Sequence, residues 1–215
     1  MKIDTSGLIS EYRKRRNDIK LRLEEFRRFH RATDHDIFPE LCFCITTANA
    51  NAMHCDKAIK ELKDTGLLWK GSAEQIRPKL KGRVRFHNKK ADYIVAARGI
   101  LKRSGCIDIK SRIDPDDIVK TRDWIVANIK GIGYKEASHF LRNIGLGQNI
   151  AILDRHILKN LKKYDVIEKI PVSVGSRKVY LDIEEKMKGF SKKVKIPMDE
   201  MDLLFWSIQT GFIFK

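Results

Sequence analysis

The segment 129–133, which reads IKGIG, contains the first residues whose types and spacing could do chemistry. Two glycines in so short a turn can take backbone angles that other residues avoid, and they leave backbone amides uncovered. Amides at the start of a helix bind anions, and a lysine beside them adds positive charge. We therefore expect Lys130, Gly131, Ile132 and Gly133 to hold a DNA phosphate without reading the base sequence. The alternative is an ordinary turn between two helices with a C-cap glycine.

Two helices must position this turn, and their apolar residues recur at helical spacing, so the helices can pack together. The first is expected to begin at the segment 114–117, DPDD, with Asp114 as cap and Pro115 at the first helical position. The second is expected to open at Tyr134. The apolar positions are Ile118, Ile125, Val126 and Ile129 in the first helix and Ala137, Phe140, Leu141 and Ile144 in the second.

Helical periodicity recurs along most of the chain, while the alternation typical of half-buried strands is nearly absent, so the sequence predicts an all-α fold. A basic loop before the stretch around Ile94 is expected to lead into a helix with Asn88 as its N-cap. The other expected helices cover about 7–31, 37–48, 51–63, 177–190 and 197–210.

Composition narrows the function classes. The chain has 215 residues and a formal net charge of +16, which favours a polyanionic partner. It has neither an apolar run long enough to span a membrane nor the pattern of a signal peptide, so we expect a cytoplasmic protein without a membrane partner. The four cysteines are too few and too irregularly spaced for a disulfide framework. A zinc site at Cys42, Cys44, His54 and Cys55 is a weaker alternative than buried thiols, because C-x-C lacks the usual ligand spacing.

The segment 129–137 and the later segment 152–156 together resemble the helix-hairpin-helix DNA glycosylase superfamily. Its hairpin is written as hydrophobic, any residue, Gly, hydrophobic, Gly, which IKGIG matches. Members with lyase activity have a lysine two positions after the last hairpin glycine, here Lys135, and an aspartate after a hydrophobic turn, here Asp154. The chain is most similar to the compact archaeal and bacterial type of 8-oxoguanine DNA glycosylase, and the resemblance covers almost its whole length.

The resemblance implies two helical lobes with the active site in the cleft between them. Residues 1–35 would pack with 150–215 as one lobe, and 36–149 would form the other, with the helix-hairpin-helix at about 116–145. It also implies a bifunctional enzyme that removes 8-oxoguanine from duplex DNA and then cleaves the strand. We expect a monomer.

The chemistry that the resemblance implies needs a neutral amine and a group that stabilises positive charge on the deoxyribose. Lys135 would supply the amine for attack on C1′, with Schiff-base formation and β-elimination following. Asp154 would stabilise the developing sugar cation and also cap its own helix. A solvated Lys135 and a purely capping Asp154 are the structural alternatives. The damaged base would leave the duplex to reach the lysine.

Recognition of the base is expected near the end of the chain. Asp202 and Trp206 are four apart on one helical face, where one could accept hydrogen bonds and the other stack on the base. A C-terminal lysine takes part in recognition in the compact family, which points to Lys215. Phe86 is a candidate for supporting the pocket, and Asn49 and Asn88 are candidates for DNA contact, although a core Phe or Trp and a capping Asn are ordinary.

We expect the protein to need no cofactor. Related glycosylases with an iron–sulfur cluster have four cysteines after the aspartate, and this chain has none beyond Cys106. The sequence does not decide whether a monovalent cation binds at the hairpin. The alternatives to the function are a helix-hairpin-helix glycosylase for another lesion, a non-catalytic DNA-binding module and, last, an RNA-binding protein, for which no recognition signature is visible.

Overall fold

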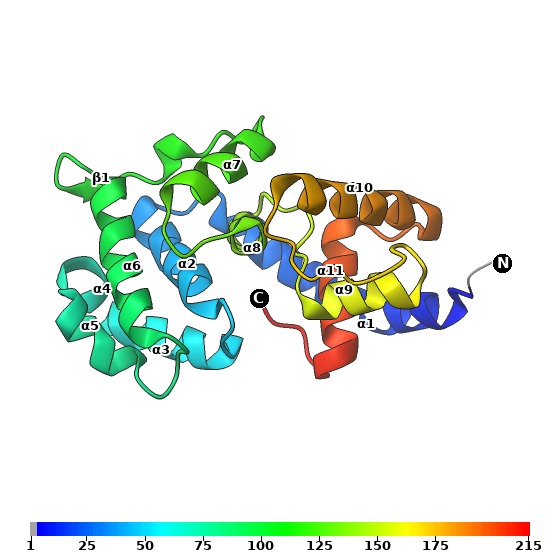
Figure 1. The fold of residues 1–215 in the computed structure, drawn as a ribbon, viewed down its shortest axis with the longest axis horizontal. Helices are drawn as coiled ribbons and strands as arrows, with labels where there is room; N and C mark the ends of the chain where they lie inside the picture. The colour runs from blue at the N-terminus through cyan, green and yellow to red at the C-terminus, as the bar shows by residue number, and fades with distance from the viewer. Residues whose placement is uncertain (1–3) are drawn as a thin grey trace. The chain divides into compact units, whose positions relative to one another are not determined.

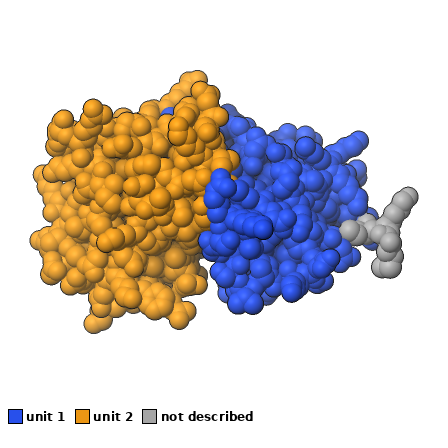
Figure 2. All heavy atoms as spheres, turned by 45° about the horizontal axis from the view of Figure 1, so that its top comes forward, with its two compact units in different colours: residues 1–30, 141–215 blue, residues 31–140 orange. Residues whose placement is uncertain are grey.

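Helices make up nearly all of the regular structure in the computed structural model, which describes residues 4–215 (Figure 1). This confirms the prediction of an all-α fold. The chain divides into two compact units, one formed by the described residues up to His30 together with Leu141–Lys215 and the other by Arg31–Phe140 (Figure 2). Among residues 4–215, no helix is both long and apolar enough to cross a bilayer.

The unit 31–140 is built around the buried helix α2. Helix α2 is apolar on nearly all sides, and α6 packs against both α2 and α5. The elements are α2 (Asp34–Thr47), α3 (Ala52–Asp64), α4 (Leu67–Lys70), α5 (Ala73–Leu80), α6 (His87–Leu101), the antiparallel pair β1 (Lys102–Arg103) and β2 (Cys106–Ile107), the 3-10 turn η1 (Lys110–Arg112) and α7 (Ile118–Asn128). Helix α8 (Tyr134–Asn143) follows, and the border between the units falls within it.

Side-chain caps explain several of the helix starts in this unit. Asn51 accepts a hydrogen bond from the His54 amide at the start of α3. At the start of α5, Ser72 and Gln75 form a capping box, each accepting from the other's backbone amide. These bonds satisfy amides that have no partner within the helix, so they fix the residue at which each helix begins.

Two predicted helix starts are wrong. Asn88 lies exposed in the first turn of α6, and Phe86 occupies the N-cap in a left-handed conformation with φ 58°. Helix α7 begins at Ile118, capped by Asp117, whose carboxylate accepts from the Lys120 amide. Asp114 fails as the cap because its side chain accepts from the amides of residues 116 and 117, which closes a separate turn before the helix.

The other unit packs three helices on α11. Its helices are α1 (Ser6–Phe29), α9 (Arg155–Lys163), α10 (Arg177–Val194) and α11 (Met198–Thr210). Ile19, Leu23 and Phe26 form the buried face of α1, as their helical spacing predicts. Tyr12 on the same helix donates a 2.6 Å hydrogen bond to Glu200 of α11. This bond supplies a partner for a carboxylate that the packing removes from water.

Candidate active site

The hairpin between α7 and α8 has the conformation that its glycines predict. Gly131 takes φ 83°, and an added Cβ there would lie 2.3 Å from Cδ2 of Tyr93 on α6. Ile129 and Ile132 are buried, and the Ile132 amide donates to the Ile129 carbonyl at 3.3 Å. The apolar residues therefore anchor the turn in the core, while Lys130 is exposed to solvent.

Lys135 lies in the first turn of α8, and Glu136 holds its amine close to the hairpin. The Lys135 Nζ atom is 2.9 Å from Oε1 of Glu136, and the other carboxylate oxygen accepts from the Gly133 amide at 3.3 Å. The side chain of Lys135 is 23% exposed, so the amine is accessible without being fully solvated. The sequence reasoning missed Glu136, although a Glu three residues after the last hairpin glycine has the spacing of a capping box.

Asp154 is the N-cap of α9, which confirms the capping part of its prediction. Its Oδ1 atom accepts from the amides of His156 at 2.7 Å and Ile157 at 2.8 Å. The carboxylate is half-buried, with its position fixed by the two amides of the first helical turn. Asp154 belongs to the unit that contains residues 141–215, and Lys135 belongs to the unit 31–140.

Asp202 forms a buried ion pair that the sequence did not reveal. Its Oδ2 atom is 3.1 Å from a guanidinium nitrogen of Arg142, and the guanidinium carbon of Arg142 is also 4.9 Å from the centre of the Phe26 ring. Burial raises the pKa of Asp202 to about 7, and Arg142 opposes that shift while Asp154 and Asp199 add to it. Asp202 and Asp154 therefore influence each other electrostatically within one unit.

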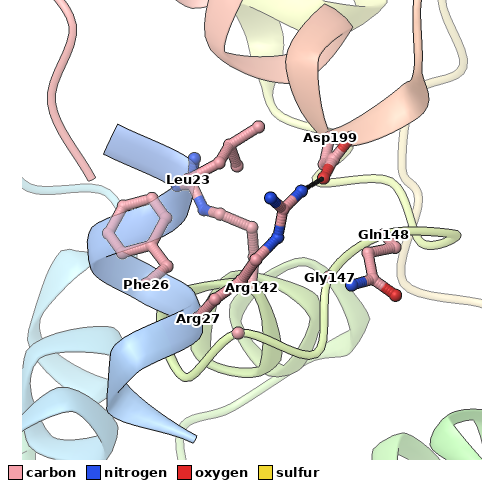
Figure 3. Close-up of a pocket in the computed structure, with 8 residues that line it drawn as sticks. Leu23, Phe26, Arg27, Arg142, Gly147, Gln148 and Asp199 are labelled. Carbon is pink, nitrogen blue, oxygen red and sulfur yellow. Dashed lines mark ion pairs between the residues drawn. The ribbon is translucent and has the colours of Figure 1, made fainter. Parts of the chain in front are cut away.

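A shallow hollow lies beside this pair, between α1, α11 and the loop after α8 (Figure 3). Arg27 reaches from α1 toward Asp199, with 3.6 Å between the paired atoms. The hollow encloses only about 10 Å³ of space for a water-sized sphere, about enough for one water molecule, so it is too small to serve as a base pocket. Its lining is Leu23, Phe26, Arg27, Arg142, Gly145, Gly147, Gln148 and Asp199.

The C-terminal residues fold back on Trp206. The Trp206 ring meets Phe212 edge-on at 5.1 Å between centroids and lies 6.4 Å from Phe214. The backbone carbonyl of Phe214 accepts from Arg22 at 3.4 Å, and Lys215 is half-buried. The structure thus places Asp202, Trp206 and Lys215 in the same unit, and the chain end is packed rather than free.

The other residues predicted to support the base pocket or contact DNA lie in the unit 31–140. Phe86 is 54% exposed, and the guanidinium of Arg85 lies 4.9 Å from the centre of its ring. Asn49 is exposed just after α2 with φ 55°, and Asn88 is exposed on α6. A large aromatic side chain exposed in a left-handed conformation is unusual, and burial in the core does not account for it.

The cysteines are thiols, and three of them are buried. Cys42, Cys44 and Cys55 are inaccessible to solvent, and burial raises the pKa of Cys42 and of Cys55. The Cys55 thiol donates to the Thr46 carbonyl at 3.2 Å. Among the residues from Asp4 onward, no group of three or more His, Cys, Asp or Glu side chains could hold a metal ion.

A family model described as 8-oxoguanine DNA glycosylase, of the helix-hairpin-helix type, matches residues 19–196. This chain belongs to the 8-oxoguanine DNA glycosylase family. Within the family, it is 47% identical over 206 residues to an 8-oxoguanine DNA glycosylase/AP lyase of Fusobacterium nucleatum, covering 95% of this chain and 94% of the relative.

Archaeal members of the family are also similar. An 8-oxoguanine DNA glycosylase/AP lyase of Methanocaldococcus jannaschii is 40% identical over 198 residues, covering 92% of this chain and 91% of the relative. The crystal structure of the M. jannaschii enzyme in complex with a 15mer DNA containing 8-oxoguanine matches with a TM-score of 0.85 at 38% identity, covering 97% of this chain and all of that chain.

Proposed function

We propose that this member of the family is a bifunctional 8-oxoguanine DNA glycosylase and AP lyase that acts on duplex DNA. The observation that carries the proposal is the Lys135 amine held in the first turn of α8, directly after a hairpin in which Gly131 and Gly133 are exposed. The family membership and the net charge of +16 support the same reaction.

The first step replaces the damaged base by the enzyme. The neutral Lys135 amine attacks C1′, a C–N bond forms, and the glycosidic bond breaks with its electron pair leaving on the base. Both helix amides bind Oδ1 of Asp154, so we assign Oδ2 to the developing positive charge on the sugar. The attached nitrogen then passes a proton to the ring oxygen O4′ as the C1′–O4′ bond breaks, which opens the sugar ring and leaves the protonated Schiff base at C1′.

The second step cleaves the strand. A proton leaves C2′ of the Schiff base, and the electron pair of that C–H bond expels the 3′ phosphate by breaking the C3′–O bond. The hairpin residues Lys130, Gly131, Ile132 and Gly133 would hold the DNA backbone during both steps, because a turn at a helix N-terminus with a cation beside it binds phosphate without contacting bases. Recognition of the flipped base is assigned to Asp202, Trp206 and Lys215, with Phe86 supporting the pocket, and Asn49 and Asn88 are assigned to DNA contact.

Borohydride trapping tests the proposal. Wild type is expected to form a covalent adduct with a duplex containing 8-oxoguanine and none with the matching guanine duplex. Lys135→Gln should lose the adduct while still binding DNA, because it lacks only the amine. Lys130→Gln is the matched control, since it removes one hairpin charge but keeps the nucleophile and should trap at saturating protein. Binding without trapping by wild type would overturn the lyase and leave a DNA-binding module.

A further inference from the structure

The segment that leads into Asp154 is buried and has no regular secondary structure. Each of the residues 150–153 is 6% exposed or less, and the segment lies between the loop after α8 and the start of α9. Buried backbone amides and carbonyls need hydrogen-bond partners, and this segment belongs to no helix or sheet that could supply them. Its partners must therefore come from local turns or from side chains.

Two side chains of α10 bind the backbone of this segment. Tyr180 is completely buried, and its hydroxyl donates to the Ala151 carbonyl at 2.6 Å and accepts from the Leu153 amide at 3.3 Å. Glu184 accepts from the Ala151 amide at 2.7 Å. Tyr180 and Glu184 are four residues apart, so they project from the same face of the helix. Together they bind both polar backbone groups of Ala151 and the amide that precedes Asp154.

These contacts lie next to the carboxylate that the proposed reaction needs. The Asp154 amide donates to the Ile152 carbonyl at 2.7 Å, and Oδ1 of the same residue is bound by the first-turn amides of α9. The backbone is thus fixed on both sides of Asp154, which restricts the positions that Oδ2 can take. A group that stabilises a developing charge must be in place before the reaction, since a displacement of about 1 Å can cost about a hundredfold in rate.

We infer that Tyr180 and Glu184 are positioning residues for the proposed excision step, which hold the segment 151–153 and thereby fix the carboxylate of Asp154. The inference rests on the role proposed for Asp154. Glu184 is only 7% exposed, so both side chains act from the interior of the unit. Apolar residues could fill the same space, but they would leave buried backbone groups without partners.

The test compares two reactions of each variant in single turnover at saturating protein. One is release of 8-oxoguanine from a duplex, and the other is borohydride trapping on a duplex with a preformed abasic site. At the abasic site the base has already left, so the Lys135 amine adds to the C1′ aldehyde and water leaves, without the charge stabilisation assigned to Asp154. Misplacement of Asp154 should therefore slow excision and spare trapping.

Tyr180→Phe removes the hydroxyl and keeps the ring. We expect it to lower the excision rate by about tenfold or more, while trapping stays close to that of wild type. Tyr12→Phe is the matched control, because Tyr12 also donates a buried 2.6 Å hydrogen bond in this unit, but to Glu200. The control should keep both rates, even if its melting temperature falls as far.

Two variants of Glu184 test the second contact. Glu184→Gln keeps an acceptor for the Ala151 amide and should excise faster than Glu184→Leu, which lacks one, and this pair decides if Tyr180→Phe does not fold. Wild-type excision by Tyr180→Phe, an equal loss of excision and trapping in that variant, or an equal loss of excision in Tyr12→Phe would overturn the inference. If wild type neither excises nor traps, the proposed function itself fails.

Discussion

The hairpin needs a glycine at position 131 for two reasons, its left-handed backbone conformation and its close contact with Tyr93, and Gly131→Ala tests both. Gly131 has φ 83°, and the left-handed conformation costs an L-residue about 1–2 kcal/mol. The added Cβ would also lie 2.3 Å from Cδ2 and 2.8 Å from Cε2 of Tyr93. Overpacking of this kind costs about 1–3 kcal/mol, so we expect a total loss of about 2–5 kcal/mol in the free energy of unfolding.

The chain provides a matched control for the backbone part of this cost. Gly82 has φ 75°, but an added Cβ there meets nothing within 4 Å. Gly82→Ala should therefore lose only about 1–2 kcal/mol, and the difference from Gly131→Ala measures the contact with Tyr93. Both residues lie in the same unit.

Urea unfolding gives the stabilities, and titration with an undamaged duplex gives the DNA affinity. Gly131→Ala should weaken DNA binding more than Gly82→Ala, since only Gly131 lies in the hairpin. In the Tyr93→Ala background, the cost of Gly131→Ala should fall to that of the control. The reasoning is refuted if Gly131→Ala costs no more than Gly82→Ala, or if removing the Tyr93 ring does not reduce its cost.

Two further predictions concern the carboxylates of the other unit. Asp154→Ser should keep the cap on α9 and the wild-type stability but lose excision of the base. Asp154→Ala should lose excision too, and its free energy of unfolding, measured by thermal unfolding, should fall by about 0.5–2 kcal/mol. If the Ser variant were as active as wild type, Asp154 would only cap the helix. Asp202 has a pKa of about 7 in the folded protein against an ordinary value of 3.8, so the folded state binds the extra proton between these values. Stability should then decline as pH rises from about 4 to 7, and Asp202→Asn should flatten that part of a melting-temperature profile; an unchanged slope would contradict the assignment.

Local features of the structure were predictable because their hydrogen bonds span only a few residues. The glycine turn at 129–133 and the start of α8 at Tyr134 follow from residue types and spacing, and the position of Asp154 at a helix start follows from the family resemblance. The two wrong helix starts are local as well. The amides of residues 116 and 117 both donate to the Asp114 carboxylate, and a sequence pattern does not show whether Asp114 or Asp117 will cap the helix.

Burial and partners at long range came only from the tertiary structure. The hydrogen bond from the Gly133 amide to Glu136 could have been predicted from the sequence, because the two residues are three apart. The carbonyls at the end of α2 that accept from Lys90 could not, because they are more than forty residues away. From sequence alone, a lysine on a helix is expected to be exposed to solvent, and only the packing of another helix against it shows that it is buried.

The sequence by itself determined the helices, the hairpin, the lysine that follows it and the capping aspartate, since each depends on neighbouring residues. The tertiary structure decided that Lys90 is buried at the carboxyl end of α2, that Tyr93 packs against Gly131 and that Asp202 pairs with Arg142. The physical reason is that charge and steric effects act through space, so their strength depends on distances and burial that only the packing of distant segments creates.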